Sequence, residues 1–256
     1  MTQSLKLEGK VAIVTGAGGK PSDHGAFGTG KAMAVLFARE GAHVIVVDRH
    51  QDRADDTRRL IEEAGGKAAV VIANLATEAD CRSVVDQAVT AFGKVDILVN
   101  NAAVARLANL LETTEEMLHE SLTVNLAIPF LLSKAAIPVM IEGGGGAIVN
   151  ISSIAALRGA GMASYAAAKA GMIGMTTAVA NAYGPDGVRA NCIAVGAVDT
   201  PLRRASVPGE YRSTPAPLNR DGDAWDIARA ALFLASEDSA HITGILLRVD
   251  AGATTR

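Results

Sequence analysis

Residues 11–30 read VAIVTGAGGKPSDHGAFGTG, a short β-branched run that leads into a glycine-rich segment. The run 11–15 predicts a buried strand, and Gly28-Thr29-Gly30 begins a helix-length segment at residues 28–40. Glycines between a strand and a helix let the backbone come close to a pyrophosphate, which the helix N-terminus attracts. The stretch therefore predicts a nucleotide-binding turn in which Gly16, Gly28 and Gly30 contact the ligand.

The rest of the chain repeats this alternation of strand and helix. Short apolar runs predict strands at residues 44–48, 68–72, 95–99, 147–151, 188–195 and 244–249. Helix-length segments of mixed polarity lie at residues 51–64, 77–92, 113–141, 163–184 and 223–236. The alternation predicts an α/β fold with a parallel sheet and helices on both faces. Because no linker, repeat or charge block divides the sequence, we expect a single domain over residues 1–256.

Composition and charge exclude several classes of protein. The net charge is −3, so no nucleic-acid or anionic-membrane partner is expected. The longest apolar stretch, residues 126–141, contains Lys134 and two prolines, which argues against a membrane span. Cys81 and Cys192 lack metal-ligand company and the histidines are scattered, so no metal site is expected. Residues 1–10 lack an apolar signal core, and we expect a soluble, cytoplasmic protein.

Asp48 stands at the end of the predicted second strand. A carboxylate at this place can accept hydrogen bonds from both ribose hydroxyls of an adenosine. It would also repel the 2′-phosphate of NADP, which favours NAD as the cofactor. Arg49 follows immediately and would offset part of that repulsion. The alternative interpretation is an exposed strand-end acid that binds no ligand.

Tyr165 and Lys169 stand four residues apart, and Ser153 lies twelve residues before the tyrosine. In a helix, positions i and i+4 share one face, so the ammonium of Lys169 can lie beside the phenol of Tyr165. A free phenol has a pKa of about 10, and a neighbouring positive charge would move this pKa toward neutrality. The pattern indicates an acid/base tyrosine that is activated by a lysine.

These features occur together in the short-chain dehydrogenase/reductase family, which the chain resembles over essentially its whole length. The matching motifs are Thr15-Gly16 with Gly28-x-Gly30, Asn100-Asn101-Ala102-Ala103, Asn125 in Val-Asn-Leu, Ser153, Tyr165-x3-Lys169 and Val195-Gly196-Ala-Val198-Asp-Thr200. The resemblance implies a doubly wound, seven-stranded Rossmann-like sheet. It also implies reversible hydride transfer between a nicotinamide cofactor, NAD by the Asp48 argument, and a small-molecule alcohol or carbonyl.

The resemblance assigns a role to each matching residue. Tyr165 would exchange the hydroxyl proton, and Lys169 would lower the tyrosine pKa and bind the nicotinamide ribose. Ser153 would hold the substrate oxygen, and Asn125 would hold a water in a proton relay. The alternatives are a structural strand-end hydroxyl for Ser153 and a buried, backbone-bonded amide for Asn125. Asn101 would support the adenosine through its backbone, while Val198 and Thr200 would meet the carboxamide.

The sequence departs from the family pattern at three places. Eleven residues, 17–27, separate the first two glycines of the motif, Gly16 and Gly28, whereas the family usually has three residues there. This segment, which contains Lys20, Pro21, Asp23 and His24, would either fold over the cofactor or bulge away from it. Asn74-Leu75 replaces the usual acidic-hydrophobic pair near the adenine, where the amide can still form a hydrogen bond. Ala103 and Val195 stand where the family frequently has glycine and proline. Both replacements are conservative, so the predicted function does not change.

The spacing of the tyrosine and the lysine bears on the type of reaction. Enoyl reductases of related fold space their tyrosine and lysine more widely, so the three-residue gap favours alcohol/carbonyl chemistry. The rival hypothesis is a non-catalytic NAD(H)-sensing or scaffolding protein of the same fold.

Substrate specificity is expected in residues 199–222, which are slightly basic and rich in proline. Helix 163–184 is rich in small residues and strand 244–249 would form a sheet edge, so we expect a homo-oligomer that covers both. The resemblance suggests a tetramer first and a dimer second.

Overall fold

The computed structural model describes residues 5–19, 25–159, 161–206 and 216–255. Its sheet has seven parallel strands in the order β3-β2-β1-β4-β5-β6-β7. The strands are β1 (Val11–Thr15), β2 (His43–Asp48), β3 (Lys67–Ile72), β4 (Ile97–Asn100), β5 (Gly146–Ser153), β6 (Val188–Val195) and β7 (Leu246–Val249). The predicted doubly wound, seven-stranded fold is therefore confirmed, with β7 at a sheet edge.

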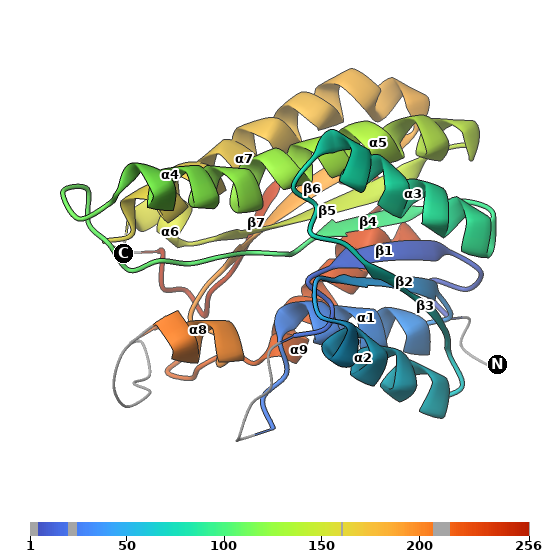
Figure 1. Cartoon of the computed structure of the whole chain (residues 1–256), viewed down its shortest axis with the longest axis horizontal. Coiled ribbons are helices and arrows are strands. Elements are labelled where there is room, and N and C mark those ends of the chain that lie inside the picture. Colours follow the sequence, from blue (N-terminus) through green and yellow to red (C-terminus); the bar gives the residue numbers. More distant parts are fainter. Residues whose placement is uncertain (1–4, 20–24, 160, 207–215, 256) are drawn as a thin grey trace.

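Helices cover both faces of the sheet (Figure 1). One face carries α3 (Glu78–Phe92), α4 (Glu115–Leu122), α5 (Ile128–Glu142) and α7 (Ala163–Tyr183). The other carries α1 (Thr29–Arg39), α2 (Gln51–Glu63) and α9 (Ala224–Ala235). The short helices α6 (Ala155–Arg158) and α8 (Pro201–Ser206) lie at the same end of the sheet (Figure 1).

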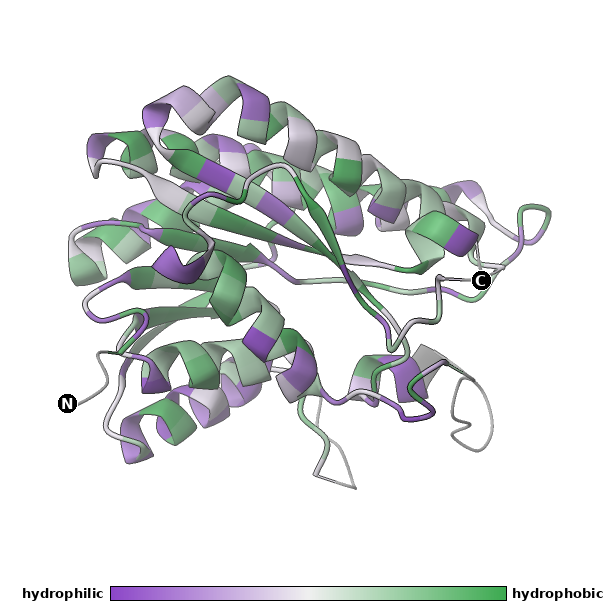
Figure 2. Ribbon diagram, turned by 180° about the vertical axis from the view of Figure 1, so that it is seen from behind, coloured by the Kyte–Doolittle hydropathy of each residue, from purple (hydrophilic) through white to green (hydrophobic). Residues whose placement is uncertain are grey.

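Strand residues alternate between two hydrophobic cores. Ala12 and Val14 pack in the core beneath α1 and α9, whereas Ile13 packs in the core beneath α3 and α5. Successive side chains of a strand point to opposite faces, so a strand buried on both faces needs a continuous apolar run. Figure 2 shows this as strands that are mostly hydrophobic along their length, between helices of mixed hydropathy.

Helix starts follow local capping signals. The Thr77 side chain accepts a hydrogen bond from the Asp80 amide, and the Asp80 carboxylate accepts one from the Thr77 amide, which together form a capping box. Thr114 caps α4 by accepting from the Met117 amide. Strand β4 begins at Ile97 rather than at the predicted residue 95. Before it, Asp96 turns its carboxylate to the Val11 amide, at 2.7 Å, instead of continuing the apolar run.

The predicted helix 113–141 is interrupted at its centre. A π-helical turn, Thr123–Ala127, joins α4 to α5 and contains Asn125. The continuous helical stretch Glu115–Glu142 is long and apolar enough to cross a membrane by length and composition alone. Its residues Leu132, Ala136 and Met140 lie in the core beneath α3 and α5, which is the environment of an internal helix in this fold.

Candidate active site

Two adjoining cavities lie at the carboxyl ends of the strands, where the strand order reverses between β1 and β4. A cleft at such a switch point is the usual ligand site of a doubly wound sheet. The first, which we call the adenosine cleft after the part of the ligand that the sequence predicts there, is lined among others by Gly16, Gly28, Gly30, Asp48, Asn74, Leu75 and Asn101. The second, the catalytic cavity, is lined among others by Ser153, Tyr165, Lys169, Val198 and Thr200. Asn101 and Thr200 line both, so the two cavities form one continuous site.

The glycine-rich turn brings α1 into close contact with β1. Gly16 has φ +64°, a conformation that favours glycine. A Cβ at Gly30 would lie 2.4 Å from the Gly16 carbonyl oxygen, so no side chain fits there. Gly28 caps α1 and leaves the first amides of the helix facing the adenosine cleft. The glycines thus keep the space at the start of α1 free of side chains, where the sequence predicts a pyrophosphate. Lys20, Pro21, Asp23 and His24 lie outside the described residues.

Asn101 connects this turn to the centre of the sheet. Its amide nitrogen donates to the Thr15 carbonyl at 2.8 Å, and its side-chain oxygen accepts from the Thr29 hydroxyl at 2.7 Å. The Thr15 hydroxyl in turn accepts from the Asn101 and Ala102 backbone amides. The side chain and the backbone amide of Asn101 are thus both used within the protein, so the predicted backbone contact with a ligand would fall to its carbonyl group.

Asp48 lies at the end of β2 with its carboxylate held by two backbone amides. Gly18 donates to Oδ2 and His50 donates to Oδ1, each at 3.0 Å. A Cβ at Gly18 would lie 2.8 Å from Asp48 Oδ2, so this glycine is required for the contact, although the sequence patterns did not single it out. Each carboxylate oxygen keeps a lone pair for a ribose hydroxyl.

Two arginines, one of them unforeseen, share the cleft with Asp48. Arg49 donates from Nε to the ring of His50. Arg53, on α2, lines the same cleft, and its Nε is buried without a partner in the described structure. Asn74 and Leu75 form a further part of the wall, and Leu75 has φ +57°, which is rare for a residue other than glycine. Strained backbone of this kind is common beside bound ligands.

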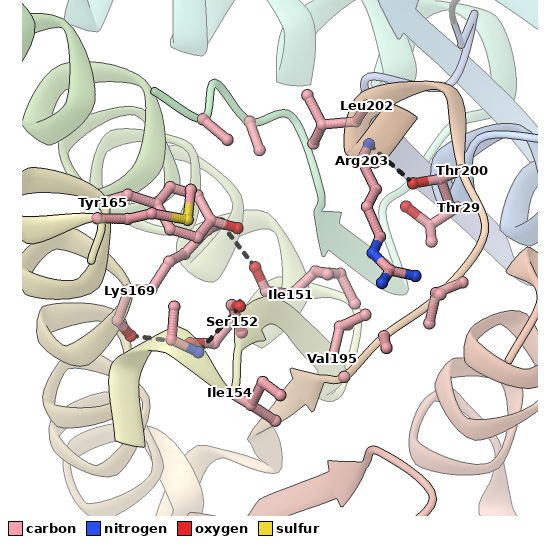
Figure 3. A pocket seen from close by; sticks show the side chains of 18 of the residues that line it. Thr29, Ile151, Ser152, Ile154, Tyr165, Lys169, Val195, Thr200, Leu202 and Arg203 are labelled. Atoms are coloured by element: carbon pink, nitrogen blue, oxygen red, sulfur yellow. Dashed lines mark hydrogen bonds between the residues drawn. The ribbon is translucent and has the colours of Figure 1, made fainter. Parts of the chain in front are cut away.

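Tyr165 lies on one wall of the catalytic cavity (Figure 3), which Ser153 also lines. The Ser153 hydroxyl accepts from the Ala155 amide at 3.1 Å and hydrogen-bonds the phenol of Tyr165. Burial raises the pKa of Tyr165 to about 12, and the bond from Ser153 lowers it. Ser153 is therefore directed at the acid/base candidate rather than serving only to end the strand.

Lys169 lies one helical turn after Tyr165, as predicted, but its ammonium is directed to the sheet. Nζ donates to the Ile151 carbonyl at 2.8 Å and lies 5.8 Å from the centre of the Tyr165 ring. Burial lowers the pKa of Lys169 to about 8. The expectation that Lys169 lowers the tyrosine pKa is wrong for the chain by itself. Burial of the phenol dominates its pKa, and the ammonium is engaged by a backbone carbonyl.

Asn125 is fully buried in the π-helical turn. Its amide nitrogen donates to the Val104 and Ser121 carbonyls at 3.0 Å, and its oxygen accepts from the Val104 amide at 3.3 Å. The side chain matches the alternative of a backbone-bonded amide. A relay through Asn125 would therefore use its main chain, and π-helical turns of this kind are frequent at functional sites.

A buried polar cluster supports the catalytic wall and was largely missed from the sequence. Ser152 donates to the Lys169 carbonyl at 2.9 Å, and the buried thiol of Cys192 contacts both Ser152 and Thr176. Burial raises the pKa of Cys192 to about 11. Because each residue alone is an ordinary small polar side chain in a strand or helix, no sequence spacing distinguishes the cluster.

The opposite wall is formed by the residues after β6. Val198 is buried and forms an isolated parallel bridge with Gly222, and Thr200 is 9% exposed. The Thr200 hydroxyl accepts from the Arg203 amide at 3.3 Å at the start of α8. Both residues line the catalytic cavity, where the sequence predicted a contact with the carboxamide. Among the described residues, no group of metal-ligating side chains occurs.

Comparison with known proteins supports an oxidoreductase. A family model described as Enoyl-(Acyl carrier protein) reductase matches residues 25–254. The chain is 36% identical over 252 residues to the 3-oxoacyl-[acyl-carrier-protein] reductase of Thermotoga maritima, covering 97% of this chain and 99% of that protein. It is 37% identical over 251 residues to the 2,5-dichloro-2,5-cyclohexadiene-1,4-diol dehydrogenase of Sphingobium indicum, covering 96% and 97%.

Solved structures agree with the sequence relatives. A Burkholderia xenovorans protein described as a short-chain dehydrogenase/reductase superimposes with a TM-score of 0.92 at 40% identity, covering 98% of each chain. A 7α-hydroxysteroid dehydrogenase in complex with NADH and 7-oxo glycochenodeoxycholic acid superimposes with a TM-score of 0.89 at 33% identity, covering 100% of this chain and 98% of that one. These relatives favour catalysis over the sensor alternative.

Proposed function

The chain belongs to the short-chain dehydrogenase/reductase family and is a hydride-transferring oxidoreductase, and we propose that it is an NAD-dependent alcohol dehydrogenase or carbonyl reductase with Tyr165 as acid/base. The observation that supports this most directly is the hydrogen bond between Ser153 and Tyr165 inside a cavity that also contains Lys169. It places a donor and an acid/base group together on the wall that a substrate oxygen would meet.

The adenosine cleft fits a nicotinamide dinucleotide. Gly16, Gly28 and Gly30 would hold the pyrophosphate against the start of α1, because no side chain fits at Gly30. Asp48 would accept the adenosine ribose hydroxyls, and Asn74 and Leu75 would contact the adenine. Val198 and Thr200 would fix the carboxamide and so the ring face offered to substrate. When bound, this group supplies or accepts the hydride.

The chain's own residues move the proton. In reduction, Tyr165 donates its phenolic proton to the substrate oxygen, and in oxidation it takes that proton back. Ser153 donates a hydrogen bond to the same oxygen and stabilises its developing negative charge. Lys169, whose pKa of about 8 leaves it mostly an ammonium near neutral pH, would bind the nicotinamide ribose and return a proton to Tyr165. The main chain of Asn125 would hold the water that resupplies it.

Alcohol or carbonyl chemistry is favoured over enoyl reduction by the Tyr165-x3-Lys169 spacing. A panel of secondary alcohols with NAD, and of ketones with NADH, read by NADH absorbance, tests the proposal. We expect turnover of at least one alcohol–ketone pair. Tight NADH binding with no turnover across a broad panel, together with a specific protein partner, would instead support the sensor alternative.

A preference for NAD over NADP is supported by the carboxylate of Asp48, which two backbone amides direct at the adenosine cleft. Like charges at close range disfavour a 2′-phosphate there. Fluorescence titration with NADH and NADPH should give a lower Kd for NADH, and Asp48→Ser should narrow the difference. Equal affinities in the wild type would mean that Arg49 and Arg53 outweigh Asp48.

A cytoplasmic homo-oligomer, tetramer first and dimer second, completes the proposal. Phe130 on α5 and Tyr183 on α7 are exposed by 55% and 37%, and Ile245 just before the edge strand β7 by 38%. Apolar groups gathered on outer helices and an open sheet edge are commonly covered by a second copy. Light scattering at micromolar concentration should show the oligomer, and a stable, active monomer would refute it. The buried thiols Cys81 and Cys192 fit a reducing compartment, which fractionation would test.

A further inference from the structure

The insertion in the glycine-rich segment leaves the turn and returns to it at nearly the same point. A Cβ added at Gly28 would lie 3.4 Å from the Cα of Gly19, so the two glycines are neighbours in space. Without residues 20–27, only three residues would separate Gly16 from Gly28, which is the usual family spacing. The insertion is therefore an eight-residue loop that is added to a turn of ordinary length.

The last residue of this loop contacts another helix through an aromatic ring. Phe27 packs against Trp225 with the ring centroids 5.3 Å apart and the ring planes inclined by 42°. Trp225 is the second residue of α9, which packs beside α1 (Figure 1). Both rings are half-buried and pack on the core beneath α1 and α9. A tilted aromatic pair stabilises a contact beyond the effect of its buried area.

Two cations of α1 add to the aromatic pair. Nζ of Lys31 lies 5.4 Å from the centre of the Phe27 ring, and the Arg39 guanidinium lies 5.5 Å from that of Trp225. Lys31 also pairs with Asp56 on α2. Because a cation is attracted to the face of an aromatic ring, Phe27 is joined to the first turn of α1 as well as to α9.

The chain enters α1 through residues that have wide conformational freedom. Gly28 caps the helix and has no side chain to fix its start. Gly19 and Gly25, on either side of the loop, both have φ +68°, a conformation that favours glycine. A hydrophobic residue directly before a helix cap fixes the angle at which the chain enters the helix. Phe27 holds this place, and its apolar partner is supplied by α9.

We propose that Phe27 is a positioning residue for the cofactor, and that its contact with Trp225 holds Gly28 and the first amides of α1 in the orientation that binds the pyrophosphate. The inference rests on the proposed function, because the ligand is the nicotinamide dinucleotide of that site. Gly28 and Thr29 line the adenosine cleft, whereas Phe27 packs outside it. Phe27 therefore acts through the backbone that follows it.

The partner of Phe27 is held independently of the insertion. Asp223 and Asp226 form a capping box at the start of α9, on either side of Trp225. Gly222, just before this box, forms the parallel bridge with Val198 on the wall of the catalytic cavity. The ring of Trp225 thus stands on a fixed helix start, which makes it a suitable anchor for the looser glycine segment.

The experiment measures the Kd for NADH by calorimetry in the full-length protein. The variants are Phe27→Ala, Trp225→Ala, the double variant, and Phe27→Tyr, which keeps the ring. Phe233→Ala, which removes a 37% exposed ring near the other end of α9, is the control. Hydrogen exchange of the amides at residues 29–31 is compared without NADH. Thermal stability, and kcat at saturating NADH, are measured for each protein.

A deletion tests whether Phe27 acts by position or by direct contact. Because Gly19 and Gly28 are neighbours in space, removal of residues 20–27 can join them directly. The short turn needs no anchor, so this variant should bind NADH within about threefold of the wild type although it lacks Phe27. Phe27→Ala keeps the long loop without its anchor and should bind more weakly than the deletion.

We expect the Kd for NADH to rise roughly 5- to 20-fold in Phe27→Ala and in Trp225→Ala. The double variant should lose no more than either single variant, because the two rings form one contact. Phe27→Tyr and Phe233→Ala should stay within about twofold of the wild type, and kcat at saturating NADH should change by less than about twofold throughout. The amides at residues 29–31 should exchange faster in Phe27→Ala.

Three results would overturn the proposal. They are a Phe27→Ala protein that binds NADH as tightly as the wild type, single-variant losses that add in the double variant, and a folded deletion variant that binds as weakly as Phe27→Ala. The last result would mean that the insertion contacts the cofactor directly. A wild type that binds no NADH would contradict the proposed function itself.

Discussion

The two walls of the catalytic cavity are built in different ways. The catalytic wall, Ser153, Tyr165 and Lys169, stands on β5 and the 21-residue helix α7 and is tied by buried hydrogen bonds. The α8 wall, residues 198–206, stands on a loop and a six-residue helix, in which Leu202, Arg203 and Arg204 are half-buried. We therefore expect the first to keep its geometry with or without substrate, and the second, which stands on a short helix, to be the less stable of the two.

From this difference we infer that one wall serves the chemistry and the other the recognition of the substrate. Proton transfer needs atoms held to within a fraction of an ångström, which regular elements with buried hydrogen bonds provide. Recognition of a particular substrate needs side chains that can be exchanged without disturbing the fold, and loops permit this. We therefore expect changes on the catalytic wall to affect turnover for every substrate, and changes on the α8 wall to affect the choice among substrates.

The largest effect on turnover short of removing the phenol is expected for Lys169→Met. Turnover should fall by about 100-fold or more, because the variant loses the ammonium that is proposed to return a proton to Tyr165. The variant should nevertheless be more stable. Burial lowers the pKa of Lys169 from its ordinary value to about 8, which corresponds to a penalty of about 3 kcal/mol for burying the charge near neutral pH. The unsatisfied Ile151 carbonyl would reduce this gain by about 1 kcal/mol.

The stability of the wild type should depend on pH through the same group. Between pH 8 and 10.5 the unfolded chain holds a proton at Lys169 that the folded chain has lost, so the free energy of unfolding rises with pH. Denaturant titrations should show this rise in the wild type and a flatter profile in Lys169→Met. Lys134→Met, which removes an exposed lysine paired with Glu78, is the control. A less stable Lys169→Met protein would contradict the burial penalty.

A smaller effect is expected for Ser152→Ala, which removes a support rather than a reacting group. Its hydroxyl donates to the Lys169 carbonyl, so kcat should fall by roughly 3- to 10-fold and the free energy of unfolding by about 1 kcal/mol. The pH profile of kcat should shift as well, because Lys169 is displaced. Thr177→Ala removes an exposed hydroxyl that is hydrogen-bonded within α7. It should change neither kcat and its pH profile nor the free energy of unfolding. A Ser152→Ala enzyme with normal kcat and pH profile would show that the cluster has no positioning role.

The last comparison of the two walls uses hydrogen exchange and needs no substitution. Amides of α8 should exchange at least about 100-fold faster than those on the buried face of α7, because a helix of six residues is marginal alone. Adding NADH should slow exchange at Thr200 and α8 and leave α7 unchanged. Equal protection of the two helices would remove the distinction between the walls.

The sequence was sufficient for the fold and for most of the site because both depend on local patterns. Buried parallel strands require apolar runs, and the predicted run 188–195 coincides with β6. Tyr165 and Lys169 share a helix, so their spacing alone places them together. Patterns fail where a contact joins distant segments: no spacing links Ser152 to Cys192, or Gly18 to the carboxylate of Asp48.

The sequence predicted a lowered pKa for Tyr165, whereas in the chain by itself burial raises this pKa; the reason is related. A sequence shows which charges stand nearby along a helix, but not that the phenol is buried or that the ammonium donates to Ile151. Likewise, the arginines of residues 199–222 look alike in the sequence. Only the structure separates Arg204, paired with Asp199, from Arg203 on the cavity wall.

Replacement of Tyr165 by Phe, assayed with any alcohol–ketone pair that the wild type turns over, tests the central claim most directly. We predict that kcat falls by roughly 100- to 10,000-fold, that the Kd for NADH stays within about twofold, and that the rise of the oxidation rate with pH disappears. This rise is expected in the wild type because the pKa of Tyr165 is raised. Tyr183→Phe, on the same helix and partly exposed, should behave as wild type. A Tyr165→Phe protein with undiminished kcat would contradict the assignment of Tyr165 as the acid/base.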